Sequence, residues 1–374
     1  MILVSLVVSL TALSAPAQDL SELVVSDGFT MAVPHLEGKR GGSTVLLADG
    51  SILLSYAKPS DMRGGPLGTV KLYGVVSKDG GRSWGDERLI EYNPACQTGR
   101  PSFMRANDGA IWIFYYGFIH YSRDDEDPAA KAKSDLWAIR SADEGKTWAQ
   151  RRKIWSGYTG ATNGAVQTRS GRIVVPFSFM IPGPMRLLST VVYSDDNGET
   201  WNQSNSLDFH GTGGTGDHSG ALEPAVVERK DGTLWMLIRT TRGRFWESLS
   251  RDDGATWSEA RATGIVSTSA PAYITRLASG RLALVWNHGR PTVDTNKRGF
   301  ITAHREGLYV ALSDDDGKTW LDAVLSARAR EVSYPYLLEV APGQLLISSG
   351  RLRAKGYETD TVTLLTTEDF LARY

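Results

Sequence analysis

The octapeptide SADEGKTW, residues 141–148, has four further copies in the chain, all of which fit the pattern S-x-D-x-G-x-T/S-W. The serine and aspartate side chains of such an octapeptide can bond the backbone of a tight turn. The central glycine supplies a positive φ, and the tryptophan packs against neighbouring strands. The other copies span residues 77–84, 194–201, 250–257 and 313–320. Copies at intervals of about fifty to sixty-five residues indicate a repeat protein.

A second repeat runs in phase with the first and consists of apolar segments on both sides of a short turn. Segments such as VLLADGSILLSY and AVVERKDGTLWMLIR are rich in branched and aromatic residues around a glycine, which is typical of β-hairpins. The first five hairpins are followed by a third strand, the octapeptide and a fourth strand. Six such hairpins are centred near Gly50, Gly109, Gly171, Gly232, Gly280 and Gly343.

Six units of four strands predict an all-β fold, namely a six-bladed β-propeller with four antiparallel strands in each blade. The last unit has no good copy of the octapeptide. We expect its outer strands to come from residues 361–368 and from residues 23–33, which together would close the ring. No linker-like composition divides the chain, so we expect residues 18–374 to form one propeller domain.

Residues 1–17 resemble a signal peptide, because an apolar run ends in Ala15-Pro16-Ala17. We therefore expect a secreted or periplasmic protein; the alternative is a buried N-terminal strand. The run is too short for a good membrane span. The formal net charge of −1 points neither to nucleic acid nor to an acidic membrane surface. Cys96 is the only cysteine, so no intrachain disulfide can form.

The direction of the strands predicts where a functional site lies. The hairpin turns and the octapeptides are separated by two strands and therefore share one face of the ring. Residues before the first strand or after the second strand of a blade must lie on the opposite face, around the axis. The polar residues at these positions, together with Arg305 before the third strand of the fifth blade, are Lys39, Arg40, Asp61, Arg100, His120, Asn163, Glu223, Arg239, Thr268, Ser269, Asn287, His288, Tyr334 and Arg351.

The octapeptides and this rim resemble the sialidase (neuraminidase) superfamily, in which the octapeptide is known as the Asp box. The resemblance spans essentially all of the chain after residue 17. It implies an exo-α-sialidase-like glycoside hydrolase in which arginines hold the substrate carboxylate, a Tyr–Glu pair supplies the nucleophile and an aspartic acid is the acid/base. The segments KRGGSTVLLADG, SYAKPSDMRGG, EPAVVERKDGTLWMLIR, HREGLYVALSDDDGKTW and VSYPYLLE place these roles on Arg40, Asp61, Glu223, Arg239, Arg305 and Tyr334.

Physical chemistry agrees with these implied roles. Arginine binds a carboxylate through two parallel hydrogen bonds and keeps its charge at any relevant pH. A neutral tyrosine activated by a glutamate avoids the repulsion between a carboxylate nucleophile and an anionic substrate. Arg100 and His288 are further candidates for substrate binding. The family tends to carry a glutamate near the acylamino group of the sugar, where this chain has Ala57 and Lys58. The expected substrate is therefore a glycan that ends in sialic acid or a related acidic sugar.

Several alternatives remain at this point. A uronic-acid polysaccharide lyase or hydrolase would use a His/Tyr pair that includes His218 or His288, and a non-catalytic propeller would only bind glycans. Arg239 and Glu223 could be a purely structural ion pair, and Tyr336 could replace Tyr334 if the register differs by two residues. The segment HGTGGTGDHSG, residues 210–220, could bind a metal through His210, Asp217 and His218, but an insertion that lines the pocket is favoured. We expect no metal and no cofactor.

Overall fold

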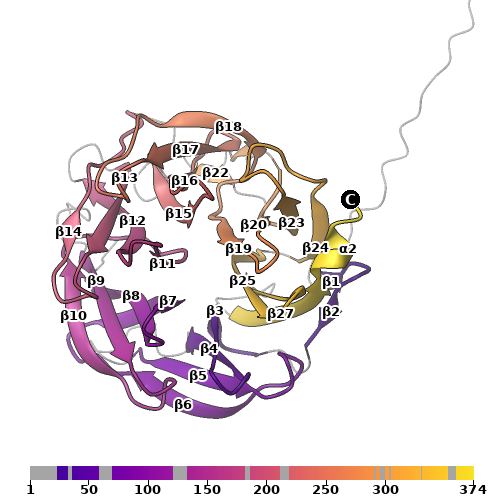
Figure 1. Ribbon diagram of the computed structural model, residues 1–374, viewed down its shortest axis with the longest axis horizontal. Coiled ribbons are helices and arrows are strands. Elements are labelled where there is room, and N and C mark those ends of the chain that lie inside the picture. Colours follow the sequence, from indigo (N-terminus) through magenta and orange to yellow (C-terminus); the bar gives the residue numbers. More distant parts are fainter. Residues whose placement is uncertain are drawn as a thin grey trace, which may run out of the picture.

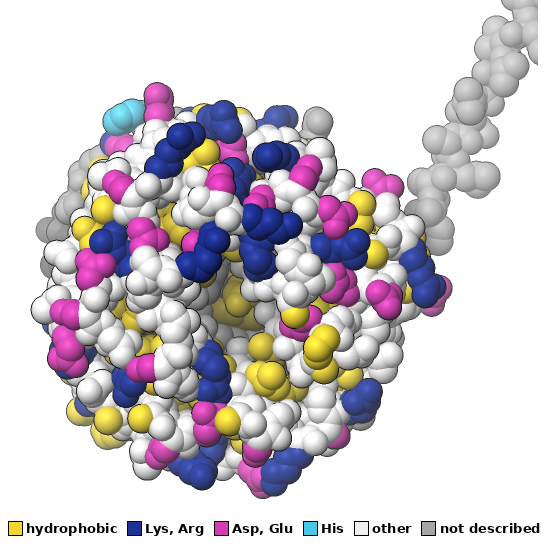
Figure 2. Space-filling view, viewed as in Figure 1, with side chains coloured by type: hydrophobic (Ala, Val, Ile, Leu, Met, Phe, Trp, Pro, Cys, Tyr) yellow, Lys and Arg dark blue, Asp and Glu magenta, His cyan; other side chains and the backbone are white. Residues whose placement is uncertain are grey.

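The computed structural model shows six β-sheets arranged as blades around a central axis (Figure 1). It describes residues 23–32, 36–58, 70–120, 133–181, 186–210, 219–289, 292–294, 300–302, 305–329, 331–352 and 359–374. Figure 2 shows that the ring is hollowed at its centre, with lysine and arginine side chains around the opening. The predicted all-β, six-bladed propeller is confirmed.

Each blade is an antiparallel sheet, and in the first four blades the strands follow one another in sequence from the axis outward (Figure 1). Blade 1 contains β3 (Arg40–Leu46), β4 (Ile52–Ala57), β5 (Leu72–Ser77) and β6 (Gly85–Glu91), and blade 2 contains β7 (Gln97–Arg105), β8 (Ile111–His120), β9 (Lys133–Ser141) and β10 (Ala149–Trp155). Blade 3 contains β11 (Val166–Gln167), β12 (Ile173–Ile181), β13 (Arg186–Ser194) and β14 (Asn202–Gln203), and blade 4 contains β15 (Leu222–Glu228), β16 (Leu234–Arg239), β17 (Arg244–Ser250) and β18 (Arg261–Val266).

The last two blades include the N-terminal strands. Blade 5 contains β19 (Tyr273–Arg276), β20 (Leu282–Trp286), β23 (Gly307–Ser313), β24 (Val324–Arg328) and, at its outer edge, β1 (Val24–Val25). Blade 6 contains β25 (Ser333–Ala341), β26 (Gln344–Leu352), β27 (Thr359–Thr367) and β2 (Thr30–Met31). A short hairpin, β21 (Thr292–Asp294) and β22 (Phe300–Thr302), occupies the connection between β20 and β23, and the short helix α2 (Glu368–Leu371) follows β27. No helix in the described part of the chain is long and apolar enough to cross a membrane.

The Asp boxes form the turns between the third and fourth strands. In the second box, Ser141 Oγ accepts a hydrogen bond from the Gly145 N–H and donates one to Asp143, both at 2.8 Å. Asp143 also accepts hydrogen bonds from the hydroxyl and the N–H of Thr147. These bonds, the side-chain bond from Thr147 above all, lower the pKa of Asp143 to about 2. The repeated residues therefore satisfy the polar groups of an exposed turn.

The glycine of the Asp box also joins neighbouring blades. Gly198 adopts a φ of +88°, and a Cβ placed on it would lie 2.3 Å from Trp112 in the preceding blade. Gly317 meets Trp235 in the same way, at 2.2 Å. Both tryptophans are almost fully buried. Only glycine allows this close approach between the turn of one blade and the core of the preceding one.

Two blades share the chain's N-terminal region. In blade 6, β2 pairs with β27 through Thr30 and Leu365, so the last blade takes its fourth strand from the start of the chain, as predicted. The pairing of β1 with β24, through Val24 and Arg328, was not foreseen, because residues 23–33 were assigned to the last blade alone. The segment therefore contacts two neighbouring blades in succession.

Candidate active site

Three of the predicted site residues occupy equivalent positions in the innermost strands. Arg100, Glu223 and Tyr334 have positive φ values of 49°, 29° and 60°, and each precedes a proline. The register of their strands shifts at these points, which identifies three β-bulges. Such bulges redirect a side chain, and a non-glycine residue in this region costs about 1–3 kcal/mol. The strain therefore falls on the residues expected to act chemically.

Tyr334 and Glu223 are in direct contact. The Tyr334 hydroxyl lies 2.8 Å and 3.1 Å from the two carboxylate oxygens of Glu223 and donates a hydrogen bond to them. The alternative Tyr336 is structural, because its buried hydroxyl bonds the backbone oxygens of Pro101 and Thr162. The register that selects Tyr334 therefore agrees with the structure.

The backbone of Glu223 is also fixed by the neighbouring blade. Its N–H donates a hydrogen bond of 3.1 Å to Ser178 Oγ, and its carbonyl oxygen accepts one of 3.2 Å from the Asn163 side-chain amide. Both partners are buried. Both backbone polar groups of Glu223 are therefore hydrogen-bonded at the bulge, which fixes the position of its carboxylate.

Two arginines, Arg239 and Arg305, are held in the cavity by the same residue, Ser269. Arg239 forms a buried ion pair with Glu223 and donates a hydrogen bond of 3.1 Å to Ser269 Oγ. Arg305 donates a hydrogen bond of 2.9 Å to the backbone oxygen of Ser269. The Arg305 Nε is buried and has no hydrogen-bond partner among the described residues. Ser269 therefore anchors both guanidinium groups while Arg305 keeps donors available.

The charges at the site stabilise one another. Burial disfavours the ionised form of Glu223, but Arg239, Arg100 and the hydrogen bonds from Tyr334 and Arg239 outweigh it, so its pKa is lowered. Burial acts against the charge of Arg239 too, but Glu223 and Tyr334 raise its pKa. For Arg305, burial and repulsion by Arg239 lower the pKa. An ionised Glu223 can therefore accept a proton from the tyrosine hydroxyl.

Arg100 lies against the ring of Tyr334. Its guanidinium carbon is 3.6 Å from the ring centroid, while that of Arg305 is 5.5 Å away. Burial disfavours the Arg100 charge, but Tyr334, Tyr116 and Glu223 raise its pKa. The tyrosine therefore lies beside two cations, within range for cation–π attraction.

These residues line a cavity of about 460 Å³ at the end of the channel where the innermost strands begin. Its remaining walls come from blades 2 and 3, mainly through aromatic and small side chains. Our sequence-based list missed these wall residues, because they lack charge and their strand ends resemble ordinary propeller sequence. The lining consists of Gln97, Arg100, Tyr116, Phe118, Ser134, Tyr158, Thr159, Gly160, Ala161, Leu187, Glu223, Arg239, Arg305 and Tyr334.

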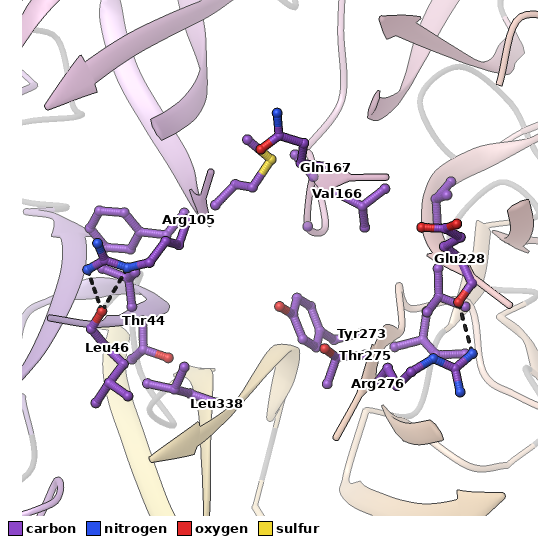
Figure 3. Close-up of a pocket in the computed structure, with 18 of the residues that line it drawn as sticks. Thr44, Leu46, Arg105, Val166, Gln167, Glu228, Tyr273, Thr275, Arg276 and Leu338 are labelled. Atoms are coloured by element: carbon purple, nitrogen blue, oxygen red, sulfur yellow. Dashed lines mark hydrogen bonds between the residues drawn. The ribbon is translucent and has the colours of Figure 1, made fainter. Parts of the chain in front are cut away.

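A larger cavity of about 920 Å³ lies at the other end of the channel, where the innermost strands end (Figure 3). Arg105 and Arg276 there donate hydrogen bonds to the backbone oxygens of Leu46 and Glu228 in the preceding blades. Both arginines also form ion pairs with carboxylates of the Asp-box turns in their own blades. Because these charged groups already hold blades together, the smaller cavity is the candidate active site.

The other predicted site residues are not all placed in the cavity. His288 is exposed, and its ring packs 5.3 Å from Tyr309 and 6.1 Å from Trp286; it is not among the described residues that line the cavity. Arg40 begins β3 and pairs through its backbone with Ala57, but its side chain lies outside the described part of the structure. Asp61 also lies outside the described residues.

The described residues contain no group of three or more histidine, cysteine, aspartate or glutamate side chains that could hold a metal ion. His210 instead lies beside Asp208, with 3.3 Å between Nδ1 and the carboxylate. Asp217 and His218, the other two members of the predicted alternative metal site, lie outside the described residues.

Comparison with known proteins places the chain among sialidase-like propellers. Residues 67–347 match the family described as "BNR repeat-like domain". A sialidase of Micromonospora viridifaciens is 26% identical over 216 residues, which is 51% of this chain and 31% of that protein. An anhydrosialidase of Macrobdella decora is 27% identical over 154 residues, or 41% of this chain and 18% of that protein. The chain thus matches less than a third of either relative.

Solved structures agree with this fold. A protein of unknown function from Dyadobacter fermentans superposes with a TM-score of 0.69 and 18% identity, covering 92% of this chain and 99% of the other. A Hadza microbial sialidase superposes with a TM-score of 0.65 and 19% identity, covering 89% of this chain and 66% of the other. At these identities the likeness establishes the propeller fold alone.

Proposed function

Because the chain belongs to the BNR repeat-like domain family, whose propeller is related to that of sialidases, we propose that it is a retaining exo-glycosidase. Its substrate would be a glycan that ends in sialic acid or a related acidic sugar. The observation that carries this proposal is the hydrogen bond of 2.8 Å between Tyr334 and ionised Glu223, inside a cavity lined by three arginines.

Tyr334 would act as the nucleophile. Glu223 would accept the phenolic proton as the Tyr334 oxygen attacks the anomeric carbon, and the bond to the leaving oxygen would break. A neutral nucleophile avoids repulsion by the sugar carboxylate, which a carboxylate nucleophile would suffer. The ion pair with Arg239 keeps Glu223 ionised before the reaction, because it favours the charged carboxylate.

The guanidinium groups would hold and orient the substrate carboxylate. Arg305 has donors left over from its contact with Ser269, and the fork geometry of arginine suits a planar carboxylate. Arg239 and Arg100 would add positive potential on either side of the tyrosine, and Arg40 would contribute from blade 1. Binding through fixed charges would place the anomeric carbon beside the tyrosine oxygen.

Asp61 would serve as the acid/base residue. It would protonate the leaving oxygen in the first step. In the second step it would remove a proton from water, whose oxygen would attack the anomeric carbon of the glycosyl–tyrosine intermediate, while the bond to the Tyr334 oxygen breaks and Glu223 returns its proton to that oxygen. Two displacements at the same carbon give net retention. We also propose that residues 1–17 direct export, since glycans with terminal acidic sugars are found outside the cytoplasm and on cell surfaces.

The test is hydrolysis of the 4-methylumbelliferyl α-glycoside of N-acetylneuraminic acid, followed by proton NMR of the first sugar released. Turnover with initial release of the α-anomer supports the proposal, and turnover with the β-anomer contradicts the retaining mechanism. Binding of acidic sugars without turnover would favour a glycan-binding propeller. Release of an unsaturated sugar from a uronic-acid polysaccharide would favour a lyase, for which the exposed position of His288 offers no support.

A further inference from the structure

Arg100 lines the candidate active site, but its guanidinium makes no hydrogen bond or ion pair with any described residue. It lies against the face of the Tyr334 ring, with its guanidinium carbon 3.6 Å from the ring centroid. By contrast, Arg239 is bonded to Glu223 and Ser269, and Arg305 is bonded to Ser269. Among the three arginines of the cavity, Arg100 is thus the one whose guanidinium has no hydrogen-bond acceptor among the described residues.

A cation in this position needs an acceptor. A guanidinium group has five N–H donors, and the side chain of Arg100 is half-buried, so bulk water reaches it only in part. The ring face attracts the positive charge but accepts none of these hydrogen bonds in the usual geometry. Arg100 is also held in a left-handed conformation at the β7 bulge, so its direction is set by the fold. The free donors of Arg100 are thus presented to whatever occupies the cavity.

The charge balance of the cavity points to a second anion. Three guanidinium groups and one carboxylate line its described part, which leaves a net charge of +2. One sugar carboxylate would neutralise only half of the excess, and charge that is partly shielded from water is costly to leave uncompensated.

We propose that the sugar bound here carries two anionic groups, and that Arg100 binds the second one, a sulfate ester or a second carboxylate. The first carboxylate would lie toward Arg305 and Arg239, which come from blades 5 and 4. Arg100 belongs to blade 2, where Gln97 and Phe118 form the adjoining wall. The second anion therefore lies toward blades 2 and 3. This inference rests on the proposed function in assuming that the ligand is an acidic sugar.

The test compares ligands that differ by one anion. Calorimetry at low salt measures the binding of three pairs of ligands. The first pair is glucuronate and its monosulfated counterpart, and the second is N-acetylneuraminic acid and its monosulfated counterpart. The third pair is gluconate and the dicarboxylate glucarate. We expect the extra anion to tighten binding to the wild-type protein by about tenfold or more in at least one pair. The sulfated pairs and the dicarboxylate pair separately identify the chemistry of the second group.

The affinity ratio within a pair is then measured in variants. Arg100→Gln should reduce the ratio to near one, because it weakens binding of the doubly charged ligand far more than binding of the singly charged one. Arg100→Lys, which keeps the charge but loses the fork, should give an intermediate ratio. Arg261→Gln, at an exposed arginine on the outer strand β18, is the matched control and should keep the wild-type ratio.

Two results would overturn the inference: wild-type ratios near one in every pair, or a ratio that Arg100→Gln leaves unchanged. Thermal unfolding shows whether each variant is folded, and Arg100→Lys tests the inference if Arg100→Gln does not fold. Because binding is measured without turnover, loss of the affinity ratio is separate from any failure of the proposed hydrolysis. A catalytically inactive protein could still show the ratio, and an active enzyme could lack it.

Discussion

The Tyr334 hydroxyl donates a hydrogen bond to Glu223 across the central cavity, although 111 positions separate the two residues in the chain. Tyr334 lies at the bulge of blade 6 and Glu223 at the bulge of blade 4. The two residues belong to different sheets, and Ser178 and Asn163 of blade 3 also hold the backbone of Glu223, so the contact depends on several blades of the ring. The pair therefore links the geometry of the scaffold to the proposed chemistry.

Tyr334→Phe should lower kcat/KM for the fluorogenic sialoside by at least about 10³-fold, because it removes the proposed nucleophilic oxygen and keeps the ring. Tyr336→Phe is the matched control. It removes a hydroxyl that bonds the backbone oxygens of Pro101 and Thr162, outside the cavity lining, and should keep kcat/KM within about tenfold of wild type. Similar losses in both variants would show that structural damage, and not chemistry, causes the effect.

Acid stability should depend on the Asp boxes. Hydrogen bonds lower the pKa of Asp79, Asp143, Asp196 and Asp315 to about 2, below the ordinary value of 3.8. A depressed folded-state pKa gives stability that is present above about pH 4 and is lost as the pH falls toward about 2. The midpoint of thermal unfolding should therefore drop steeply through this window.

Asp143→Asn tests this linkage, because it removes one of the four carboxylates. The variant should unfold at a lower temperature than wild type at pH 7, and the difference should shrink as the pH approaches about 2. Asp322→Asn is the control, since its carboxylate makes no side-chain hydrogen bond with the described residues. A constant difference between Asp143→Asn and wild type at all pH values would contradict the assignment.

The sequence was sufficient for the fold because the deciding signals are local. Each Asp box satisfies its own turn within eight residues, and each hairpin has apolar segments on both sides of a short turn. Strand direction then predicted that Arg100, Glu223, Arg239, Arg305 and Tyr334 share one end of the channel, and the structure brings these residues together. Their chemical roles remain proposals.

Long-range packing was harder to predict. Nothing local distinguishes β1 from β2, so the pairing of Val24 with Arg328 could not be read from composition. His288 follows a buried strand, but the aromatic surfaces of Trp286 and Tyr309 hold its ring outside the cavity lining. Phe118 and Tyr158 form uncharged walls of the cavity, but no sequence pattern distinguishes them from aromatic residues elsewhere in the strands.

Replacement of the Asp-box glycine should destabilise the packing between neighbouring blades. In Gly198→Ala, the new Cβ would lie 2.3 Å from Trp112, and φ is +88°. Gly109→Ala is a matched control, since it has a similar φ of +83° but no atom within 4 Å of the added Cβ. The control should lose about 1 kcal/mol of unfolding free energy, and Gly198→Ala should lose about 1–3 kcal/mol more. Equal losses in urea denaturation would refute a packing role.

Closure of the ring should depend more on β2 than on β1. The Ala32 N–H donates a hydrogen bond of 3.0 Å to Thr363 in the closing blade, and the Ser26 N–H donates one of 3.0 Å to Ser326 in blade 5. A proline at either position has no N–H and therefore removes this hydrogen bond to the neighbouring strand. Ala32→Pro affects the fourth strand of blade 6, whereas Ser26→Pro affects only a fifth strand added to a complete sheet.

Ala32→Pro should therefore lower the urea midpoint more than Ser26→Pro does. It should also expose the C-terminal strand β27 to faster amide hydrogen exchange, because that strand loses its outer neighbour. Equal midpoints for the two variants, or unchanged exchange in β27, would mean that contacts other than β2 close the ring. The short helix α2 would then be the next segment to test, since Phe370 packs edge-on against Phe29 at 5.9 Å.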